Sequence, residues 1–395
     1  MEINKLKEAE LQMSDTNVVP GIDRFLADHR GDGKRYGLIT NQTGITSKGE
    51  PTWKAMQNSG LNLVTIFGPE HGFRGESQDA VEIGDQEFHR MRVYSLYGDR
   101  LRPEPHQLEG LDALVFDIQD VGCRYYTYLY TLAYAMQVCA EVGLPFIVLD
   151  RPNPLNGVTV EGGPISREHD CFVGGYGLPP RYGMTIGEYA RYVAGEYYPK
   201  ADLTVIELSG FRRSEYGTGL PWVIPSPNLP SLECAVVYPG TCLFEGTNIS
   251  EGRGTTRPFE IIGAPWIDNE QLRLALGARA LPGATFASMF FTPTFSKHRG
   301  ATCQGVMICV TDREVFKPLL TGITMMQVIR DLSGDSFEWR QDWEREGHYF
   351  LDRLAGGPRM REMFDAGADP ASIYREMVKG QEDFLAARAK YLIYP

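Results

Sequence analysis

The stretch "DALVFDIQDVGCRYYTYLYTLAYAMQVCAEVGLPFIVLD", residues 112–150, decides the predicted fold. It starts with a short apolar run, continues through a polar turn into a long helical segment, "YTYLYTLAYAMQVCAEVG", and ends in a second apolar run, "PFIVLD". Two buried strands joined by a helix of this length form a right-handed βαβ unit, whose strands are parallel. The same alternation surrounds the runs "RYGLIT", "LNLVTIF" and "DLTVIEL". The sequence therefore predicts an α/β fold with a doubly wound parallel sheet.

The composition changes at about Pro221. The segment "LPWVIPSPNLPSLECAVVYPG", residues 220–240, is rich in proline, so we expect neither a helix nor a central strand to continue through it. We place a domain boundary there, which gives a first domain at residues 15–222 and a second at residues 223–395. The second half mixes strand-like runs such as "ATFASMFFTPTF" with helical runs such as "GITMMQVIRDL" and "IYREMVKGQEDFLAARAKYL". It predicts a smaller α/β or α+β domain.

The charge balance bears on the partners of the chain. Lys and Arg number 39 against 51 Asp and Glu, a net charge of −12, and no basic cluster occurs. This argues against a nucleic-acid or anionic-membrane partner. The first residues lack the apolar core of a signal peptide, and no run reaches the ~18 apolar residues of a membrane span, so we expect a cytoplasmic protein without a membrane segment. The seven cysteines form no C-x-x-C pair and are expected to be reduced thiols.

Unusually polar turns follow four of the predicted strands, "RYGLIT", "LNLVTIF", "DALVFD" and "PFIVLD". In an open parallel sheet, ligands bind at the carboxyl ends of the strands, where such turns converge. Amides, carboxylates and guanidinium groups gathered at one sheet edge predict a site for a polyhydroxylated ligand. The turns lie at residues 41–44, 68–72, 119–124 and 151–154.

Several common site signatures are absent from the sequence. The first turn, "NQTGIT", has no G-x-G-x-x-G, and neither G-x-x-x-x-G-K-[ST] nor G-x-S-x-G occurs, which disfavours a dinucleotide, a P-loop nucleotide and a serine nucleophile. No H-E-x-x-H pattern is present, and the seven histidines are scattered. Glu70 and His71 with Asp117 and Asp120 could hold a metal ion, and this alternative stays open.

The carboxylates of these polar stretches fit glycoside hydrolysis. Glycoside cleavage uses one carboxylic acid to protonate the leaving oxygen, and usually a second group as base or nucleophile on the other face of the sugar. Glu70 fits the acid because partial burial at a strand end would favour its protonated form; the alternative is a carboxylate that caps the next turn. A second carboxylate is expected in "LFEGTNISEGRGTTRPFE", residues 243–260, which contains Glu245, Glu251 and Arg253. The alternative for this stretch is a solvated loop.

Six ordered motifs give the sequence a family resemblance. They are "GLITNQTG", "FGPEHGFRG", "VFDIQDVGCRYYTY", "LDRPNPLNG", "PSPNLP" and "YPGTCLFEGTNISEGRGTTRPFE". Together they resemble the exo-acting β-N-acetylmuramidases of the NamZ or YbbC type, formerly the domain of unknown function DUF1343, over nearly the whole chain. The resemblance implies a Rossmann-like N-terminal domain, a smaller C-terminal domain and an active site in the cleft between them. The implied activity is removal of N-acetylmuramic acid from the non-reducing end of peptidoglycan fragments, without a cofactor or a metal.

The resemblance also implies roles for individual residues. Glu70 of "GPEHG" is expected to be the catalytic acid, and Glu251, in preference to Glu245, its partner. Many members of the family are exported, so a periplasmic or extracellular location is the alternative to the cytoplasm. The candidate substrate-binding residues are Asn41, His71, Arg74, Asp117, Asp120, Arg124, Tyr126, Arg151, Asn153, Asn228, Glu245 and Arg253.

The lactyl carboxylate of N-acetylmuramic acid, absent from N-acetylglucosamine, calls for a guanidinium, which binds a carboxylate bidentately. The candidates are Arg74, Arg124, Arg151 and Arg253. Tyr125, Tyr126 and Tyr128 offer a surface for stacking on a sugar, and packing in the core is the alternative. A non-catalytic muropeptide-binding protein and a metal-dependent hydrolase remain the alternatives to a glycosidase. The sequence predicts no particular oligomeric state.

Overall fold

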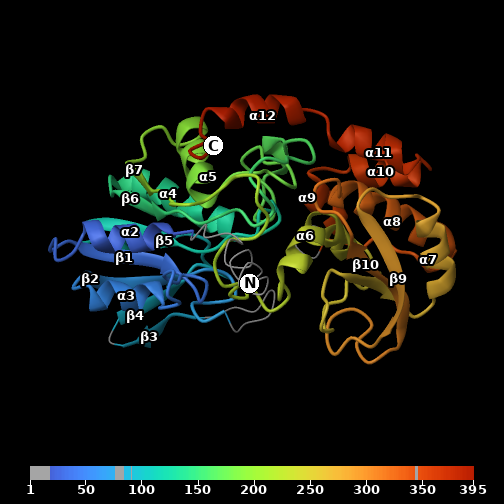
Figure 1. Cartoon of the computed structure of the whole chain (residues 1–395), viewed down its shortest axis with the longest axis horizontal. Helices are drawn as coiled ribbons and strands as arrows, with labels where there is room; N and C mark the ends of the chain where they lie inside the picture. Colours follow the sequence, from blue (N-terminus) through green and yellow to red (C-terminus); the bar gives the residue numbers. More distant parts are fainter. Residues whose placement is uncertain (1–17, 76–83, 90, 343–345) are drawn as a thin grey trace, which may run out of the picture.

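The computed structural model describes residues 18–75, 84–89, 91–342 and 346–395, which form two sheets flanked by helices (Figure 1). The larger sheet has seven strands in the order β3-β4-β2-β1-β5-β6-β7. Its strands are β1 (Arg35–Thr40), β2 (Asn62–Gly68), β3 (Gln86–Phe88), β4 (Met91–Ser95), β5 (Ala113–Asp117), β6 (Phe146–Leu149) and β7 (Leu203–Ile206).

The strands from β4 to β7 pair in parallel, and β3 adds an antiparallel edge. The chain moves outward from β1 to one side, then returns to its other side with β5, which is the strand order of a doubly wound Rossmann-type sheet. The predicted α/β fold is confirmed. The edge pair β3 and β4 was not predicted, because its residues, "QEF" and "MRVYS", form no continuous apolar run.

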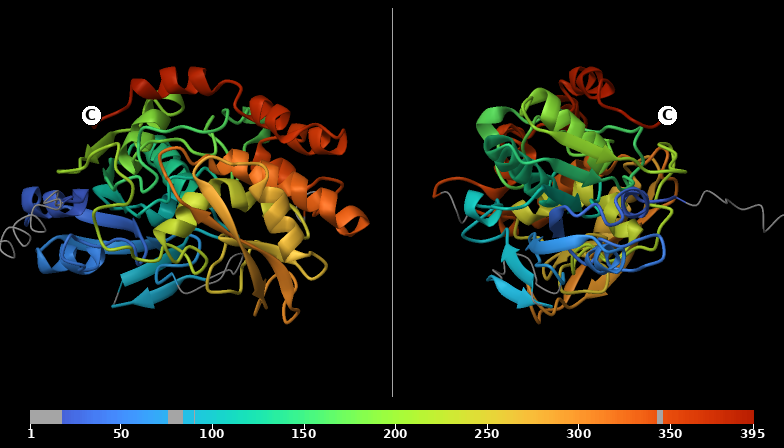
Figure 2. Two further views of the ribbon diagram at one scale, coloured as in Figure 1. Left: turned by 45° about the vertical axis from the view of Figure 1, so that its right-hand side comes forward. Right: turned by 90° about the vertical axis from the view of Figure 1, so that its left-hand side faces the viewer.

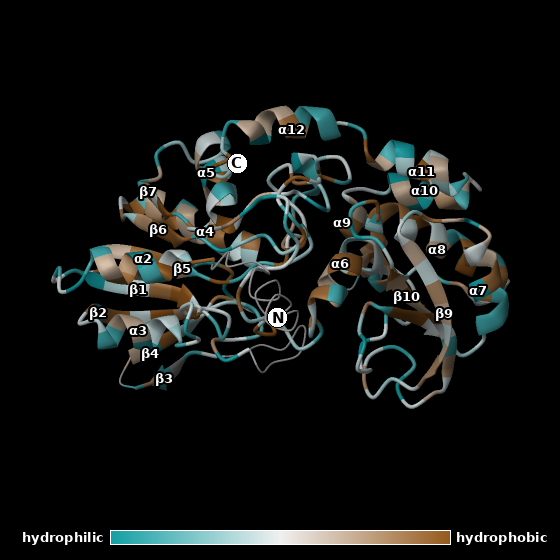
Figure 3. Cartoon of the chain, viewed as in Figure 1, coloured by the Kyte–Doolittle hydropathy of each residue, from teal (hydrophilic) through white to brown (hydrophobic). Residues whose placement is uncertain are grey.

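Helices cover both faces of this sheet, namely α2 (Gly21–Asp28) and α3 (Thr52–Asn58) on one face and α4 (Tyr128–Val142) and α5 (Ile186–Glu196) on the other (Figure 1). The alternation along β5 shows why both faces need cover. Val115 is buried with Phe25 of α2, whereas Phe116 is buried with Met136 of α4. Successive strand residues point to opposite faces, so a strand buried on both sides is largely apolar; Figure 3 shows much of β1 in the colour of hydrophobic residues.

The second sheet is antiparallel, with the order β8-β10-β9. It belongs to the second half of the chain, which forms a smaller unit beside the first (Figure 1). Its elements are α6 (Leu232–Thr241), β8 (Ile261–Ala264), α7 (Asn269–Gly277), β9 (Ala284–Phe291), β10 (Cys303–Val310), α8 (Pro318–Ser333), α9 (Phe350–Ala355), α10 (Arg359–Asp365), α11 (Pro370–Met377) and α12 (Gln381–Ala389). Short 3₁₀ turns lie at Pro105–Gln107, Arg167–His169, Cys242–Gly246 and Gly334–Ser336.

Two expectations about helices in the second half are wrong. The proline-rich segment does contain a helix, α6, which starts at a cap where the Ser231 side chain accepts a hydrogen bond from the Cys234 amide. Pro239 is tolerated because it stands near the end of α6, where the chain already tightens into a 3₁₀ turn. The single helix expected at residues 373–392 is two helices, since Gly380 adopts a φ of 77° between α11 and α12.

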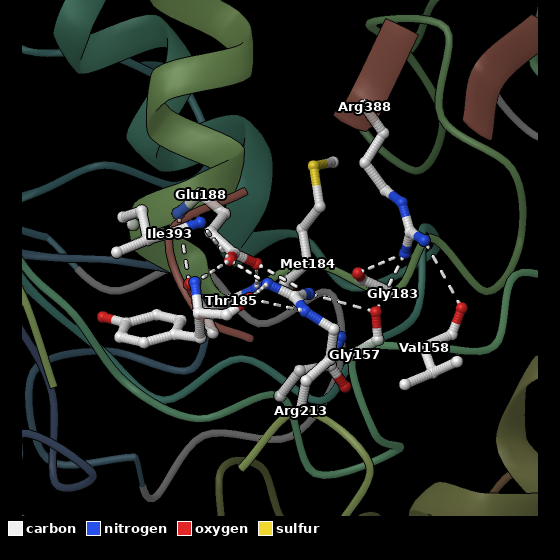
Figure 4. A network of polar contacts seen from close by, with 12 residues as sticks. Gly157, Val158, Gly183, Met184, Thr185, Glu188, Arg213, Arg388 and Ile393 are labelled. Atoms are coloured by element: carbon white, nitrogen blue, oxygen red, sulfur yellow. Dashed lines mark hydrogen bonds and ion pairs between the residues drawn. The ribbon is translucent and has the colours of Figure 1, made fainter. Parts of the chain in front are cut away.

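The segment from α12 to residue 394, here called the C-terminal strap, returns from the second unit to the first, as the views in Figure 2 show. Arg388 of α12 donates to the carbonyl oxygens of Gly157 at 3.0 Å and of Gly183. The backbone amide of Ile393 donates to Glu188 at 2.7 Å, and the buried Glu188 is paired with Arg213 (Figure 4). Buried polar groups of the first unit are therefore satisfied by the strap. Among the described residues, no helix is long and apolar enough to cross a membrane.

Candidate active site

A cavity of ≈110 Å³ lies between the two units, where the loops after β2, β4 and β5 face the second half of the chain. The carboxyl ends of parallel strands are the expected place for a ligand in such a sheet. Residues of both halves of the chain line this cavity. The first unit contributes Glu70, His71, Tyr97, Tyr125, Tyr126 and Thr127, and the second half contributes Asn228, Tyr238, Glu245, Arg253, Phe259 and Arg353.

Glu70 stands at the tip of the loop that follows β2, and its residue is 5% exposed. The hydroxyl of Thr127, just before α4, donates to Oε2 of Glu70 at 2.6 Å. The loop turns sharply because His71 and Gly72 adopt positive φ values of 66° and 79°. A left-handed conformation is uncommon for a residue other than glycine, and such backbone strain gathers at functional sites. The loop therefore holds Glu70 and His71 together in the cavity wall.

Aromatic rings from both units form the next part of the lining. The ring centroids of Tyr125 and Tyr126 each lie 6.3 Å from that of Tyr238, in edge-to-face arrangements. Tyr238 in turn meets Phe259 edge-on at 4.7 Å. Burial raises the pKa of the Tyr125 and Tyr126 hydroxyls well above their usual range, so both stay protonated. These rings present apolar surface together with neutral hydroxyl groups.

A chain of four charged side chains supports the wall that the second half contributes. Arg253 is paired with Glu245 at 2.5 Å and, through Nε, with Glu251 at 3.5 Å. Glu251 is paired in turn with Lys297 at 2.7 Å. Lys297 comes from the connection between β9 and β10 and also donates to the Phe244 carbonyl oxygen at 2.7 Å. Alternating charges thus fix the guanidinium of Arg253, which lies over the ring of Phe259 in the cavity lining.

The environment of Glu251 differs from that of Glu70. Burial acts to raise the pKa of Glu251, but the cations Lys297 and Arg253 outweigh it and hold that pKa below its usual range. Glu251 is 2% exposed, and each of its oxygens faces one of these cations. The lining formed by the described residues contains Glu245 and not Glu251. The catalytic role of Glu251 stays a prediction.

Three of the four arginines considered for the lactyl carboxylate point elsewhere. Arg151 forms a buried ion pair with Asp117 at 2.5 Å. Arg124 is buried and donates to the carbonyl oxygens of Leu178 and Leu354, and Arg74 is exposed and lies over the Phe88 ring. Arg253 is the member of the four that lines the cavity. Arg353, which carries an ion pair to Asp342 at 3.2 Å, also lines it and was missed, because its sequence surroundings show no motif.

Several of the other predicted residues shape the loops. Asn41 accepts hydrogen bonds from the amide and the hydroxyl of Thr43, and Asn153 accepts one from the amide of Leu155. Asp120 accepts from Gly122 at 2.6 Å and from the Tyr182 hydroxyl. Burial raises the pKa of Asp120 to about 6. These contacts lie within the turns at the sheet edge, whereas Asn228 reaches the cavity itself.

The metal alternative rested on Glu70, His71, Asp117 and Asp120. Within residues 18–75, 84–89, 91–342 and 346–395, no group of three or more His, Cys, Asp and Glu side chains is placed to hold a metal ion. Asp117 accepts from Arg151 and Thr52, and Asp120 from Tyr182, so both carboxylates already have protein donors.

The fold and the site define a two-unit α/β protein with a carboxylate- and tyrosine-lined cavity between a Rossmann-like sheet and a smaller unit. Two family models match the chain, described as Exo-beta-N-acetylmuramidase NamZ, N-terminal, over residues 36–233, and Exo-beta-N-acetylmuramidase NamZ, C-terminal, over residues 236–394. The chain therefore belongs to the exo-β-N-acetylmuramidase NamZ family, as the motifs indicated.

Individual relatives agree with this assignment. The peptidoglycan β-N-acetylmuramidase NamZ of Bacillus subtilis (strain 168) is 45% identical over 384 residues, which cover 95% of this chain and 91% of the relative. A crystal structure of a DUF1343 family protein from Bacteroides fragilis NCTC 9343 matches with a TM-score of 0.86 at 32% identity, over 97% of this chain and 100% of that one. A second protein of that family from the same organism matches with a TM-score of 0.77 at 29% identity, over 96% and 99% of the two chains.

Proposed function

We infer that the chain is a glycoside hydrolase that removes N-acetylmuramic acid from the non-reducing end of peptidoglycan fragments. Membership of the exo-β-N-acetylmuramidase family supports this activity. The observation that carries the chemistry is Glu70, a carboxyl group at 5% exposure in the cavity wall, fixed by the Thr127 hydroxyl. A buried carboxyl group is suited to donate a proton to the leaving oxygen of a glycoside.

We assign the roles around Glu70 from the geometry of the cavity. The tyrosine rings give the terminal sugar an apolar wall, and His71 is placed beside Glu70 to hydrogen-bond a sugar hydroxyl. Arg253, held by carboxylates on two sides, is the guanidinium for the lactyl carboxylate. The net charge of −12 argues against a nucleic-acid partner.

The second catalytic group is proposed to be Glu245, which faces the cavity from the opposite unit. It either acts as base or nucleophile or orients the 2-acetamido group of the substrate, whereas Glu251 positions Arg253. Replacing each in turn, as Glu245→Gln and Glu251→Gln, separates the two assignments. Glu245→Gln should lower kcat, in addition to any rise in KM that follows from its pair with Arg253, whereas Glu251→Gln should raise KM without a comparable fall in kcat.

The decisive test of the function uses Glu70→Gln with 4-nitrophenyl β-N-acetylmuramide, with and without a chelator. The amide keeps the size of the side chain but has no proton to donate, so turnover should fall by ~10²–10⁴-fold while binding of N-acetylmuramic acid persists. A substrate with a poorer leaving group should lose more. Wild-type turnover is expected to survive the chelator.

The matched control is Glu161→Gln, which alters an equally buried carboxylate that accepts from the Leu319 amide, outside the cavity. It should keep most of the activity. Retention of more than about a tenth of the turnover by Glu70→Gln would show that Glu70 is not the acid. Loss of wild-type turnover to the chelator would point to a metal-dependent reaction.

A further inference from the structure

Two more cavities lie along α4. One, of ≈230 Å³, is lined by tyrosines that include Tyr130, Tyr134 and Tyr198, with Arg167 beside them. The other, of ≈600 Å³, lies between α4 and residues 99–105, and Tyr134 lines both. We call the two cavities together the α4 groove.

Phe172 connects the α4 groove with the active-site cavity. Phe172 lines the active-site cavity, and the preceding residue, Cys171, lines the first cavity of the groove. The Phe172 ring lies 6.1 Å from Tyr97, which also lines the active-site cavity, and 6.1 Å from Tyr134 in a stacked orientation. Aromatic rings therefore form a continuous path from one site to the other.

The groove starts on the side of the catalytic acid. Thr127, which donates to Glu70, directly precedes α4, and the amide of Leu96 bonds the carbonyl of Gly68 at 2.8 Å, which places Tyr97 beside the Glu70 loop. The groove then follows one face of the helix, because Tyr130, Tyr134, Gln137 and Glu141 are spaced at helical intervals. From the first to the last of these four residues the helix advances ~17 Å.

We propose that the α4 groove is the site for the leaving part of the substrate, a chain of several pyranose rings, and this rests on the proposed function. The acid must lie at the oxygen that joins the terminal sugar to the rest of the chain, so the rest of the chain leaves on the Glu70 side. At ≈110 Å³, the active-site cavity is smaller than either cavity of the α4 groove.

The groove also has the chemistry that a pyranose chain needs. Tyr134 and Tyr197 are partly exposed and offer aromatic faces for the apolar faces of the rings. Polar groups that can meet the sugar hydroxyls lie between them, since the hydroxyl of Tyr198 contacts that of Tyr176 at 2.8 Å and Gln137 at 3.3 Å. An apolar wall with a few convergent polar groups is typical of a small-molecule binding site.

The test compares kcat/KM on two substrates that share the terminal sugar. The first is 4-nitrophenyl β-N-acetylmuramide, which has no saccharide to place in the groove. The second is a tetrasaccharide of alternating N-acetylmuramic acid and N-acetylglucosamine with the former at the non-reducing end. Tyr134→Ala should lower the ratio of tetrasaccharide to aryl kcat/KM by about tenfold, the effect of one lost aromatic contact. Arg102→Ala, at the exposed groove wall, should lower the same ratio by a smaller factor.

Phe290→Ala is the matched control, because this exposed aromatic residue on β9 lies away from the groove; it should leave both values unchanged. An unchanged ratio in both groove variants would overturn the proposal. So would an equal loss on both substrates in Tyr134→Ala with no effect of Arg102→Ala, since the ring would then serve the fold alone. Absence of wild-type turnover on both substrates would instead contradict the proposed function itself.

Discussion

At the scale of single residues, the carboxylates near the cavity are distinguished by their partners. Glu70 accepts a hydrogen bond from the Thr127 hydroxyl, whereas Glu251 lies between the cations Lys297 and Arg253. The two cations hold the pKa of Glu251 below its usual range, which suits a permanent anion.

Of the four arginines considered for the lactyl carboxylate, Arg253 is the one that lines the cavity, so the prediction about selectivity for the muramide concerns Arg253. Arg253→Ala should lower kcat/KM for the muramide by an amount that corresponds to ~1.5–3 kcal/mol of activation free energy, the scale of a lost hydrogen bond to a charged group. Activity on the matching glucosaminide, which has no lactyl carboxylate, should change much less. The measurement is the ratio of the two kcat/KM values.

Arg74→Ala is the control for Arg253, since Arg74 is exposed and stacks on Phe88 outside the cavity lining. The ratio of kcat/KM on the muramide to kcat/KM on the glucosaminide should be the same for Arg74→Ala as for the wild type. Equal losses on both substrates in Arg253→Ala would assign the arginine to the framework of the site.

The raised pKa of Asp120 should make the stability of the protein depend on pH. Burial raises its pKa to about 6, so the folded state holds this proton more tightly than the unfolded state, where the pKa is near 3.9. Its contribution is complete below about pH 3.9 and is lost as the pH rises through about 6, a change of ~2–3 kcal/mol. Asp120→Asn should remove this fall.

Urea midpoints of both proteins between pH 4 and pH 7 test the assignment. The wild type should lose stability relative to Asp120→Asn across this range. Parallel curves would mean that Asp120 is ionised throughout.

At the scale of elements, strand ends were predictable and long-range partners were not. Glu70 could be placed at a sheet edge because an apolar run precedes it and glycines follow. Lys297 could not be paired with Glu251, because the two are separated by 46 residues and meet only through the packing of the β9–β10 connection. Arg353 of α9 was missed because its sequence surroundings show no motif, and α6 was missed because the prolines of residues 220–240 outweighed the capping serine.

Replacing Lys297 should destabilise the part of the cavity wall that the second half of the chain contributes. Lys297→Met would leave the buried Glu251 with Arg253 as its remaining cationic partner, at 3.5 Å. Breaking a buried ion pair from one side costs ~3–5 kcal/mol of unfolding free energy. The double variant Lys297→Met with Glu251→Gln should recover much of this loss, because no buried charge is then left without compensation.

The control is Lys379→Met, which removes an exposed lysine paired with Glu376 at 2.7 Å. Pairs of this kind contribute ~0–1 kcal/mol. Denaturant unfolding of the variants measures the differences. A loss in Lys297→Met no larger than in Lys379→Met would contradict the prediction.

At the scale of the whole molecule, the C-terminal strap links the two units that form the cavity. Arg388→Met should destabilise the protein, because the Gly157 and Gly183 carbonyl oxygens lose a buried donor, at ~1–3 kcal/mol for each unsatisfied group. Lys390→Met, two residues along the strap, removes an exposed lysine 3.7 Å from Glu196 and should have little effect. Melting temperatures measure both, and equal shifts would show that Arg388 does not anchor the strap.

The path of the strap also bears on the order of folding. Arg388 and Gly157 are 231 residues apart in sequence, and Ile393 and Glu188 are 205 residues apart. Contacts between such distant residues close large loops, and their entropic cost makes them form slowly. The Rossmann-like unit, which contains both Glu188 and Arg213, is therefore expected to form before the strap docks. Docking of α12 is the event after which both walls of the cavity are tied together, so catalytic competence is expected to appear later in refolding than the sheet itself.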